Sequence, residues 1–322
     1  MTVSLITDRA TLAGAVWASL AMGLFSLNDL LIKYLSGDYP LHLVMTVRAV
    51  VALVLLFAVI VPLGGGMGQL RPRRVGMHVL RGGFVVLANL CFFLGLAALP
   101  LAEAVALSFI SPFLIMAFSA FFLGEPVGPR RWAAAAVGLV GVLLVLRPGT
   151  EAFQAAALLP LAGALFYALM QTVTRAIGGT ETAVSLTFSI QVSFLVVSLA
   201  FGIALGDGRF AGSGHPSMEF LLRAWVWPPM PDLAIMAAIG ALSALGGLAI
   251  SQAYRVSEAA FVAPFDYAAM PLAVLFGALV FGEWPDAVAW AGITLILASG
   301  LVLIWREVVA RRALDAHRTA RR

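Results

Sequence analysis

Ten apolar runs, each about as long as a membrane-spanning helix, divide this chain. They cover residues 12–35, 40–62, 76–99, 102–124, 131–147, 155–175, 183–205, 231–253, 259–281 and 287–305. Only 11% of the residues are charged, whereas a soluble domain has about a quarter. A bilayer offers backbone groups no water, so an apolar run of this length spans it as a helix. The sequence therefore predicts an all-α polytopic membrane protein with about ten transmembrane helices.

One pattern of residues occurs twice, 158 positions apart at its centre. It comprises a Gly-Glu pair, a Trp and a Gly-x5-Arg: Gly124-Glu125, Trp132 and Gly141 to Arg147 in the first copy, and Gly282-Glu283, Trp290 and Gly300 to Arg306 in the second. We expect two repeats of five helices, residues 12–147 and 155–306, followed by a basic cytoplasmic tail, residues 307–322. Because five is odd, the second repeat enters the membrane inverted. Two inverted five-helix repeats are typical of carriers that open alternately to either side.

The distribution of charge predicts the orientation of the chain. The net charge of +4 raises the question of nucleic-acid binding, but most of the 20 Lys and Arg residues lie between apolar runs, on the side of the N-terminus. This asymmetry places both termini in the cytoplasm and argues against a nucleic-acid partner. The single cysteine, Cys91, lies inside an apolar run, which leaves no disulfide and no thiolate metal site.

The motifs at the turns and in three spans resemble a known family. The Gly-Glu-Pro and Gly-Glu-Trp-Pro turns are similar to those of EamA modules in the drug/metabolite transporter superfamily. Within it, the sequences Asn28-Asp29, Lys33, Asp38-Tyr39-Pro40, Arg48 and Ala263-Pro264-Phe265-Asp266-Tyr267 resemble a bacterial subgroup with S-adenosylmethionine-type and vitamin-type carriers. The resemblance implies a ten-helix carrier of the bacterial inner membrane that imports or exports a metabolite, often driven by a proton or substrate gradient.

Charged residues inside spans are costly, so each needs an explanation. Asp29 and Arg48 lie about 9 Å and about 12 Å from the outer ends of the first two spans, at about 1.5 Å per residue. One interpretation is a salt bridge that joins these two helices. The other is a binding site, with a substrate carboxylate or phosphate on Arg48 and a proton on Asp29. Lys33, four residues after Asp29, could compete for its carboxylate.

Asp266 is the second charged candidate, for substrate or proton binding. It lies between Pro264 and Pro271 in the ninth span, and Pro112 interrupts the matching span of the first half. Interrupted helices at matching places in two repeats are the best sequence indication of a transport site. Tyr267 beside it could stack on a flat ligand and donate a hydrogen bond.

Other polar residues inside spans are weaker candidates for substrate binding. They are Asn89, Tyr167 and Gln171, and such groups more often bond a neighbouring helix than a ligand. For Glu125 and Glu283, at the ends of spans, we expect capping and turn roles.

The predicted function is secondary active transport of a small organic metabolite by alternating access. Amino acids, S-adenosylmethionine-like and vitamin-like solutes all fit, and a proton is the favoured coupling ion, with uniport or exchange as alternatives. The chain has no phosphate-binding Gly-Lys-Ser/Thr loop, and its four histidines lack ligand spacing, so we expect neither an enzyme nor a metal or other cofactor. A membrane scaffold or a lipid scramblase is the alternative. The expected partners are the substrate and the lipid bilayer, and a homodimer is left open.

Overall fold

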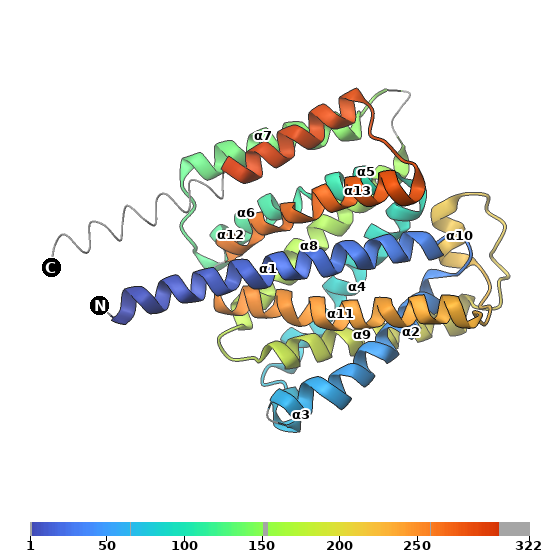
Figure 1. Cartoon of the computed structure of the whole chain (residues 1–322), viewed down its shortest axis with the longest axis horizontal. Helices are drawn as coiled ribbons and strands as arrows, with labels where there is room; N and C mark the ends of the chain where they lie inside the picture. The colour runs from blue at the N-terminus through green and yellow to red at the C-terminus, as the bar shows by residue number, and fades with distance from the viewer. Residues whose placement is uncertain (1, 65, 151–153, 258, 303–322) are drawn as a thin grey trace.

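The computed structural model of the protein describes residues 2–64, 66–150, 154–257 and 259–302, and in these ranges every regular element is helical. The predicted tail, residues 307–322, and Arg306 at the end of the second predicted repeat lie outside them. The α-helices are α1 (Thr2–Leu35), α2 (Leu41–Leu55), α3 (Val61–Gly64), α4 (Val75–Ala98), α5 (Leu101–Ser108), α6 (Ser111–Leu123), α7 (Pro129–Leu146), α8 (Leu158–Ile177), α9 (Ala183–Leu205), α10 (Pro216–Leu222), α11 (Met230–Val256), α12 (Ala259–Val262) and α13 (Ala269–Phe281), followed by the unlabelled helix Ala287–Val302 (Figure 1). One π-helical segment is η1 (Leu56–Ile60). Three 3-10 segments are η2 (Met67–Leu70), η3 (Ala155–Ala157) and η4 (Ala263–Ala268).

The long helices form one bundle whose outer surface is apolar. Eight helical segments in the described chain are long and apolar enough to cross a membrane, and Phe265–Phe281 and Ala287–Val302 are shorter apolar helices. Large side chains point outward, for example Ile203 at 87% and Phe121 at 84% exposure. Such a surface is stable against lipid and unfavourable in water. The chain is therefore an all-α polytopic membrane protein, as its sequence predicts.

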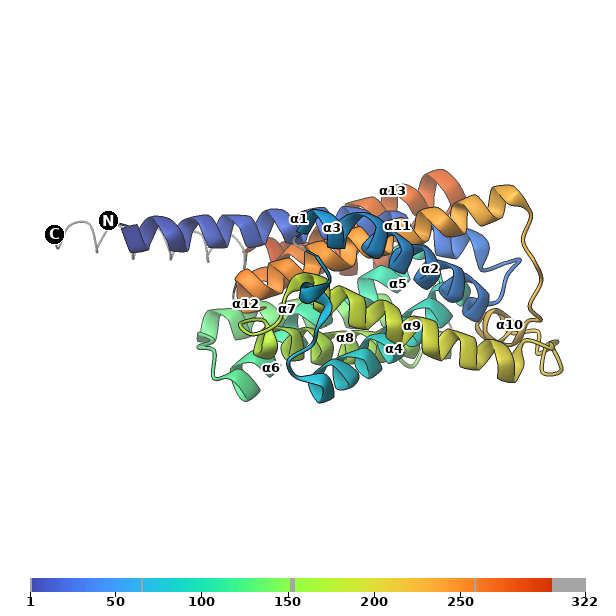
Figure 2. The same ribbon diagram turned by 90° about the horizontal axis from the view of Figure 1, so that it is seen from below.

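Helices from the two halves of the chain alternate in the bundle. α1 packs along α11, α4 along α8, and α2 along α9 (Figures 1 and 2). Each of these pairs joins a helix that precedes residue 150 to one that follows it. The two halves are therefore interleaved, and any space at the centre of the bundle is lined by both of them.

The helix breaks expected near the prolines are present. α5 ends at Ser108, and α6 begins at Ser111, directly before Pro112. In the second half, the 3-10 segment η4 interrupts the helix between α12 and α13. A 3-10 turn has hydrogen bonds of poorer geometry than an α-helix, so η4 leaves backbone N–H and C=O groups available inside the bundle.

The two Gly-Glu turns have the same backbone geometry. Gly124 ends α6 with φ 68°, and Gly282 ends α13 with φ 67°, a left-handed conformation that glycine adopts without strain. The amide of Glu125 donates to Ser119 O at 3.2 Å, and that of Glu283 donates to Gly277 O at 2.9 Å. The duplication seen in the sequence thus extends to local conformation.

An ion pair joins the halves at each end of the bundle. We call the end where α1 begins the N-terminal face. There, Arg175 Nε of α8 lies 3.0 Å from Glu125 Oε1. At the opposite face, Lys33 Nζ of α1 lies 2.8 Å from Glu283 Oε1. Both glutamates belong to the Gly-Glu turns, so each ion pair links the first long helix of one half to a turn of the other.

The opposite face has further polar contacts. Glu283 Oε2 accepts the amide of Leu101 at 2.8 Å, so this glutamate caps α5, a helix of the other half of the chain. Arg147 pairs with Asp286, and together with the amide of Ala289 it lowers the pKa of the Asp286 carboxyl to about 2. Lys33 is therefore engaged at this face and does not compete for Asp29, in contrast to one of the sequence interpretations.

α7 and the helix Ala287–Val302 lie side by side at the edge of the bundle (Figure 1). A Cβ on Gly141 would lie 2.8 Å from Gly292 O, and a Cβ on Gly292 would lie 2.7 Å from Gly141 O. The two backbones are therefore in direct contact, which only glycine permits at this distance.

We predict that Gly141→Ala destabilises the protein by about 1–3 kcal/mol, because the added methyl group would force two backbones apart. The measurement is the melting temperature of the purified protein in detergent. Gly83→Ala, in the middle of α4, is the matched control, since a Cβ there meets nothing within 4 Å. Equal melting temperatures for the two variants would show that this contact carries no stability.

Candidate functional site

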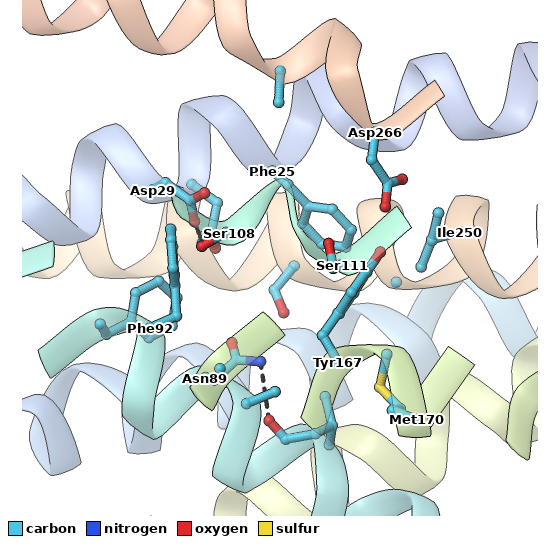
Figure 3. Close-up of a pocket in the computed structure, with 18 of the residues that line it drawn as sticks. Phe25, Asp29, Asn89, Phe92, Ser108, Ser111, Tyr167, Met170, Ile250 and Asp266 are labelled. Carbon is cyan, nitrogen blue, oxygen red and sulfur yellow. Dashed lines mark hydrogen bonds between the residues drawn. The ribbon is translucent and has the colours of Figure 1, made fainter. Parts of the chain in front are cut away.

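A cavity of about 190 Å³ lies in the middle of the bundle (Figure 3). Residues of α1, α2, α4, α5, α6, α8, α9, α11, α13 and η4 line it, so both halves of the chain contribute. Its walls are mainly aromatic and aliphatic, with a small number of polar side chains between them. This is the composition of a small-molecule site.

Arg48 of α2 lines the cavity and is 4% exposed. Its Nε donates to Ser243 Oγ of α11 at 2.8 Å, and Nη1 donates to Asn89 Oδ1 of α4 at 3.3 Å. Its guanidinium also stacks over the ring of Phe194, 4.7 Å from the centroid. Gln191, near the position in the second half that matches Arg48, donates to the same Ser243 hydroxyl at 3.1 Å. Neutral groups from three other helices therefore hold the guanidinium.

Asp29 of α1 lines the same cavity and accepts from Asn28 Nδ2 at 3.2 Å. Within the described ranges no ion pair joins Asp29 to Arg48. The salt bridge that the sequence suggests as a structural alternative is thus not formed. Both charged groups remain available to a ligand.

Asp266 of η4, which packs against α1, also lines the cavity and is 4% exposed. Neither of its carboxylate oxygens has a hydrogen-bond partner in the part of the chain that the structure describes. In Figure 3 the carboxylate points toward the hydroxyl of Tyr167, which rises from α8. A buried carboxylate without a partner is costly, so a proton or a ligand is expected to satisfy it.

The structure brings five of the seven candidates for substrate binding together. Asp29, Arg48, Asn89, Tyr167 and Asp266 all line the cavity. The other two lie outside its lining. Tyr267 packs its ring against Phe109, with centroids 5.2 Å apart, and Gln171 is fully buried one turn beyond Tyr167 on α8.

Several residues of the cavity wall were not predicted from the sequence. They include the aromatic rings of Phe25, Phe92, Phe93, Phe109 and Phe194 and the hydroxyl of Ser243. A phenylalanine in an apolar span has no sequence signal that separates a cavity wall from a lipid contact. Among the described residues, His, Cys, Asp and Glu side chains do not gather in groups of three that could hold a metal ion.

Comparisons with known proteins identify the family. Residues 12–147 match the model of the EamA-like transporter family. A riboflavin transporter of Rhizobium johnstonii is 31% identical over 95% of this chain and 96% of its own length. A riboflavin transporter of Vibrio cholerae is 29% identical over 94% of this chain and 96% of its own length. An S-adenosylmethionine uptake transporter of Rickettsia prowazekii is 23% identical over 93% of this chain and 95% of its own length.

The fold also has a solved counterpart. A crystal structure 22% identical in sequence superposes with a TM-score of 0.66 over 92% of this chain and 97% of that chain. The relatives and the family model confirm the resemblance recognised in the sequence and the prediction of a transporter rather than an enzyme. The chain therefore belongs to the EamA-like transporter family, as a multi-pass membrane protein that transports a small metabolite.

Proposed function

We propose that the protein is a secondary carrier of the bacterial inner membrane that moves a flavin or a similar flat metabolite by alternating access. The observation that carries this proposal is the central cavity, which is lined by both halves of the chain. The charge distribution supports an orientation in which the N-terminal face is cytoplasmic. Arg71, Arg74, Arg130 and Arg175 all flank spans at that face.

The cavity suits a flat heterocycle with polar edges. Several phenylalanine rings supply apolar faces on which such a ring system can stack. Arg48 and Asn89 supply hydrogen-bond donors for its carbonyl oxygens, and Asp29 supplies an acceptor. The names of three relatives, riboflavin transporters of Rhizobium johnstonii, Vibrio cholerae and Brucella anthropi, support riboflavin as the first substrate to test.

Other relatives carry different metabolites. Those of Rickettsia are S-adenosylmethionine uptake transporters, and one of Pseudomonas aeruginosa is a pseudopaline exporter. The frame is therefore compatible with several substrates and with both directions of transport. The riboflavin transporter of Rhizobium johnstonii has the higher sequence identity, 31% against 23% for the Rickettsia prowazekii protein, and this favours a flavin here.

The two ion pairs at the ends of the bundle support alternating access. To open the cavity toward the opposite face, Lys33 must leave Glu283. To open it toward the N-terminal face, Arg175 must leave Glu125. Each pair is partly shielded, with side-chain exposures of 11% and 27% for the first and 29% and 14% for the second. We propose that they act as two latches, of which at most one is open at a time and both are formed in this structure.

Asp266 and Asp29 are the proposed proton-coupling groups. Both line the cavity, and neither belongs to an ion pair in the described structure. A carboxylate that exchanges a proton between the two open states couples the flux of substrate to the proton gradient. Tyr267 and Gln171, which lie behind the wall, remain predicted substrate contacts that would require movement to reach the ligand.

Purified protein in liposomes should transport riboflavin, and Arg48→Gln should raise the half-saturating concentration roughly 10- to 100-fold. The expected loss is that of hydrogen bonds from a charged donor, about 1.5–3 kcal/mol. Flavin fluorescence inside the vesicles measures the flux. Arg209→Gln removes an exposed charge from the loop after α9 and is the control. Flux of another metabolite but not of riboflavin would contradict the flavin assignment.

Asp266→Asn should abolish the dependence of transport on an imposed pH gradient while the protein stays folded and inserted. The amide has a similar shape but cannot take up or release a proton. The measurement compares substrate accumulation with and without the gradient. Asp207→Asn changes an exposed carboxylate and should behave as wild type. Accumulation that still follows the gradient in Asp266→Asn would exclude Asp266 as the coupling site.

Breaking either latch should shift the carrier toward the state open at that end. An ion pair worth about 1 kcal/mol corresponds to a population change of about fivefold. With Cys91→Ser as background and Ser108→Cys as a reporter in the cavity, Glu283→Gln should speed labelling by an impermeant thiol reagent from the opposite face. Glu125→Gln should speed it from the N-terminal face.

The charge exchange Lys33→Glu with Glu283→Lys is the matched control for the first latch. It restores the pairing of charges but not the cap that Glu283 gives α5, so it should return the labelling rate part of the way toward that of the reporter alone. Labelling that increases from the same face in both single variants would contradict the assignment of one latch to each end.

A further inference from the structure

A second group of buried polar side chains lies beyond the cavity, toward the N-terminal face. Its centre is Arg81 of α4, which is fully buried. Nε donates to Thr174 Oγ1 at 2.5 Å, Nη1 donates to Leu186 O at 2.7 Å, and Nη2 donates to Ser251 Oγ at 3.3 Å. All three acceptors are neutral, and the ion pairs of the described residues do not include this guanidinium.

Four helices place this group directly beneath the floor of the cavity. Arg81 precedes the lining residue Val85 by four positions on α4, and Leu186 precedes Ile190 by four on α9. On α8, Thr174 follows Met170 by four, and on α11, Ser251 follows Gly247 by four. Val85, Ile190, Met170 and Gly247 all line the cavity. Four residues of helix correspond to about 6 Å, so one helical turn separates the two groups.

Two further buried polar side chains lack hydrogen-bond partners among the described residues. The hydroxyl of Tyr254 is fully buried, and neither it nor the Asp266 carboxylate has a hydrogen-bond partner within the described chain. Tyr167 interacts electrostatically with both Asp266 and Arg81, and Tyr254 interacts with Asp266 and Tyr167. Tyr167 and Asp266 line the cavity, and Tyr254 follows the lining residue Ile250 by four positions on α11, so polar groups lie both at the cavity wall and one turn beyond it on the side of Arg81.

A purely structural role explains only part of this arrangement. Arg81 does join α4 to α8, α9 and α11. However, a neutral amide could cross-link helices without the cost of burying a charge. The guanidinium has five N–H donors, of which three are used here. Buried oxygens without hydrogen-bond partners and unused donors of a cation, next to this cavity, are features expected of a ligand-binding site.

We propose that Arg81 and Tyr254, together with Asp266 in its protonated form, make an inner subsite that donates hydrogen bonds to oxygen acceptors of the substrate when the carrier opens toward the N-terminal face. Carbonyl or carboxylate oxygens are the groups that Arg81 and the Tyr254 hydroxyl recognise. The substrate then passes from Arg48, on the outer side of the cavity, to Arg81, on the inner side. This inference rests on the proposed alternating access and is independent of the identity of the substrate.

The first test measures access without altering Arg81. In a Cys91→Ser background, Ser251→Cys should react with an impermeant thiol reagent in inside-out vesicles and not in right-side-out vesicles. Riboflavin should slow this reaction about tenfold. Ala253→Cys, also fully buried on α11, is the control and should remain unreactive.

The outcomes of this test separate the two proposals. If Ser251→Cys does not react with the reagent from either face, the inner subsite is refuted. It is refuted as well if the cysteine reacts but no metabolite of a panel that includes riboflavin and S-adenosylmethionine slows the reaction. If S-adenosylmethionine protects it and riboflavin does not, the subsite stands and the flavin assignment falls.

The second test uses transport by variants with small changes. Tyr254→Phe removes one hydroxyl, and Arg81→Lys retains the charge but loses the planar fork. Both should raise the half-saturating substrate concentration about tenfold when substrate is supplied at the N-terminal face, and leave it unchanged at the opposite face. A merely structural role would instead lower the melting temperature and reduce the flux from both faces alike, which would overturn the proposal.

Discussion

The central cavity depends on how one buried cation, Arg48, is held. Arg48 could have been fixed by Asp29, and the resulting ion pair would have closed the middle of the bundle. Instead, the guanidinium is held by Ser243, Asn89 and the face of Phe194. Neutral partners satisfy its geometry without cancelling its charge, so a ligand can still gain from it. The same arrangement recurs around Arg81, whose three acceptors are a threonine, a serine and a backbone carbonyl.

Ion pairs lie at the two ends of the bundle instead. Lys33–Glu283 joins the two halves at the opposite face, and Arg175–Glu125 joins them at the N-terminal face. There, water can replace either partner, so breaking a pair costs about 1 kcal/mol rather than the several kcal/mol of a buried pair. Because α1, α2 and α4 alternate with α8, α9 and α11, loosening one end does not require the core to come apart. For the proposed exchange between two open states, contacts at the ends must break at a low free-energy cost, and charged groups in the cavity must be free of ion pairs.

The sequence predicted the helices, the repeated turns and the buried charges well, because each follows from the spacing of residue types along the chain. Apolar length gave the helices, the repeated Gly-Glu turns gave matching conformations at Gly124 and Gly282, and the rarity of charge in spans led to Asp29, Arg48 and Asp266. The neighbours of these residues were harder to predict. In a 3-10 helix successive side chains diverge by about 120°, so Asp266 faces the cavity while Tyr267 faces Phe109. The spacing of Lys33 from Asp29 indicated a contact, but a turn about 250 residues away in the chain supplies the actual partner.

The residues that sequence reasoning missed are also those that can distinguish one substrate from another. A charge in a span constrains any carrier of this frame, whereas the shape of the cavity is set by rings such as Phe25, Phe92 and Phe194, which are indistinguishable in sequence from lipid-facing phenylalanines. Relatives that share the frame transport riboflavin or S-adenosylmethionine, or export pseudopaline. Since one methylene of apolar contact is worth about 1 kcal/mol, small changes in these rings can alter selectivity while the charges and latches stay the same. In the proposed carrier, apolar packing in the cavity can therefore change specificity while Asp29, Arg48 and Asp266 stay in place.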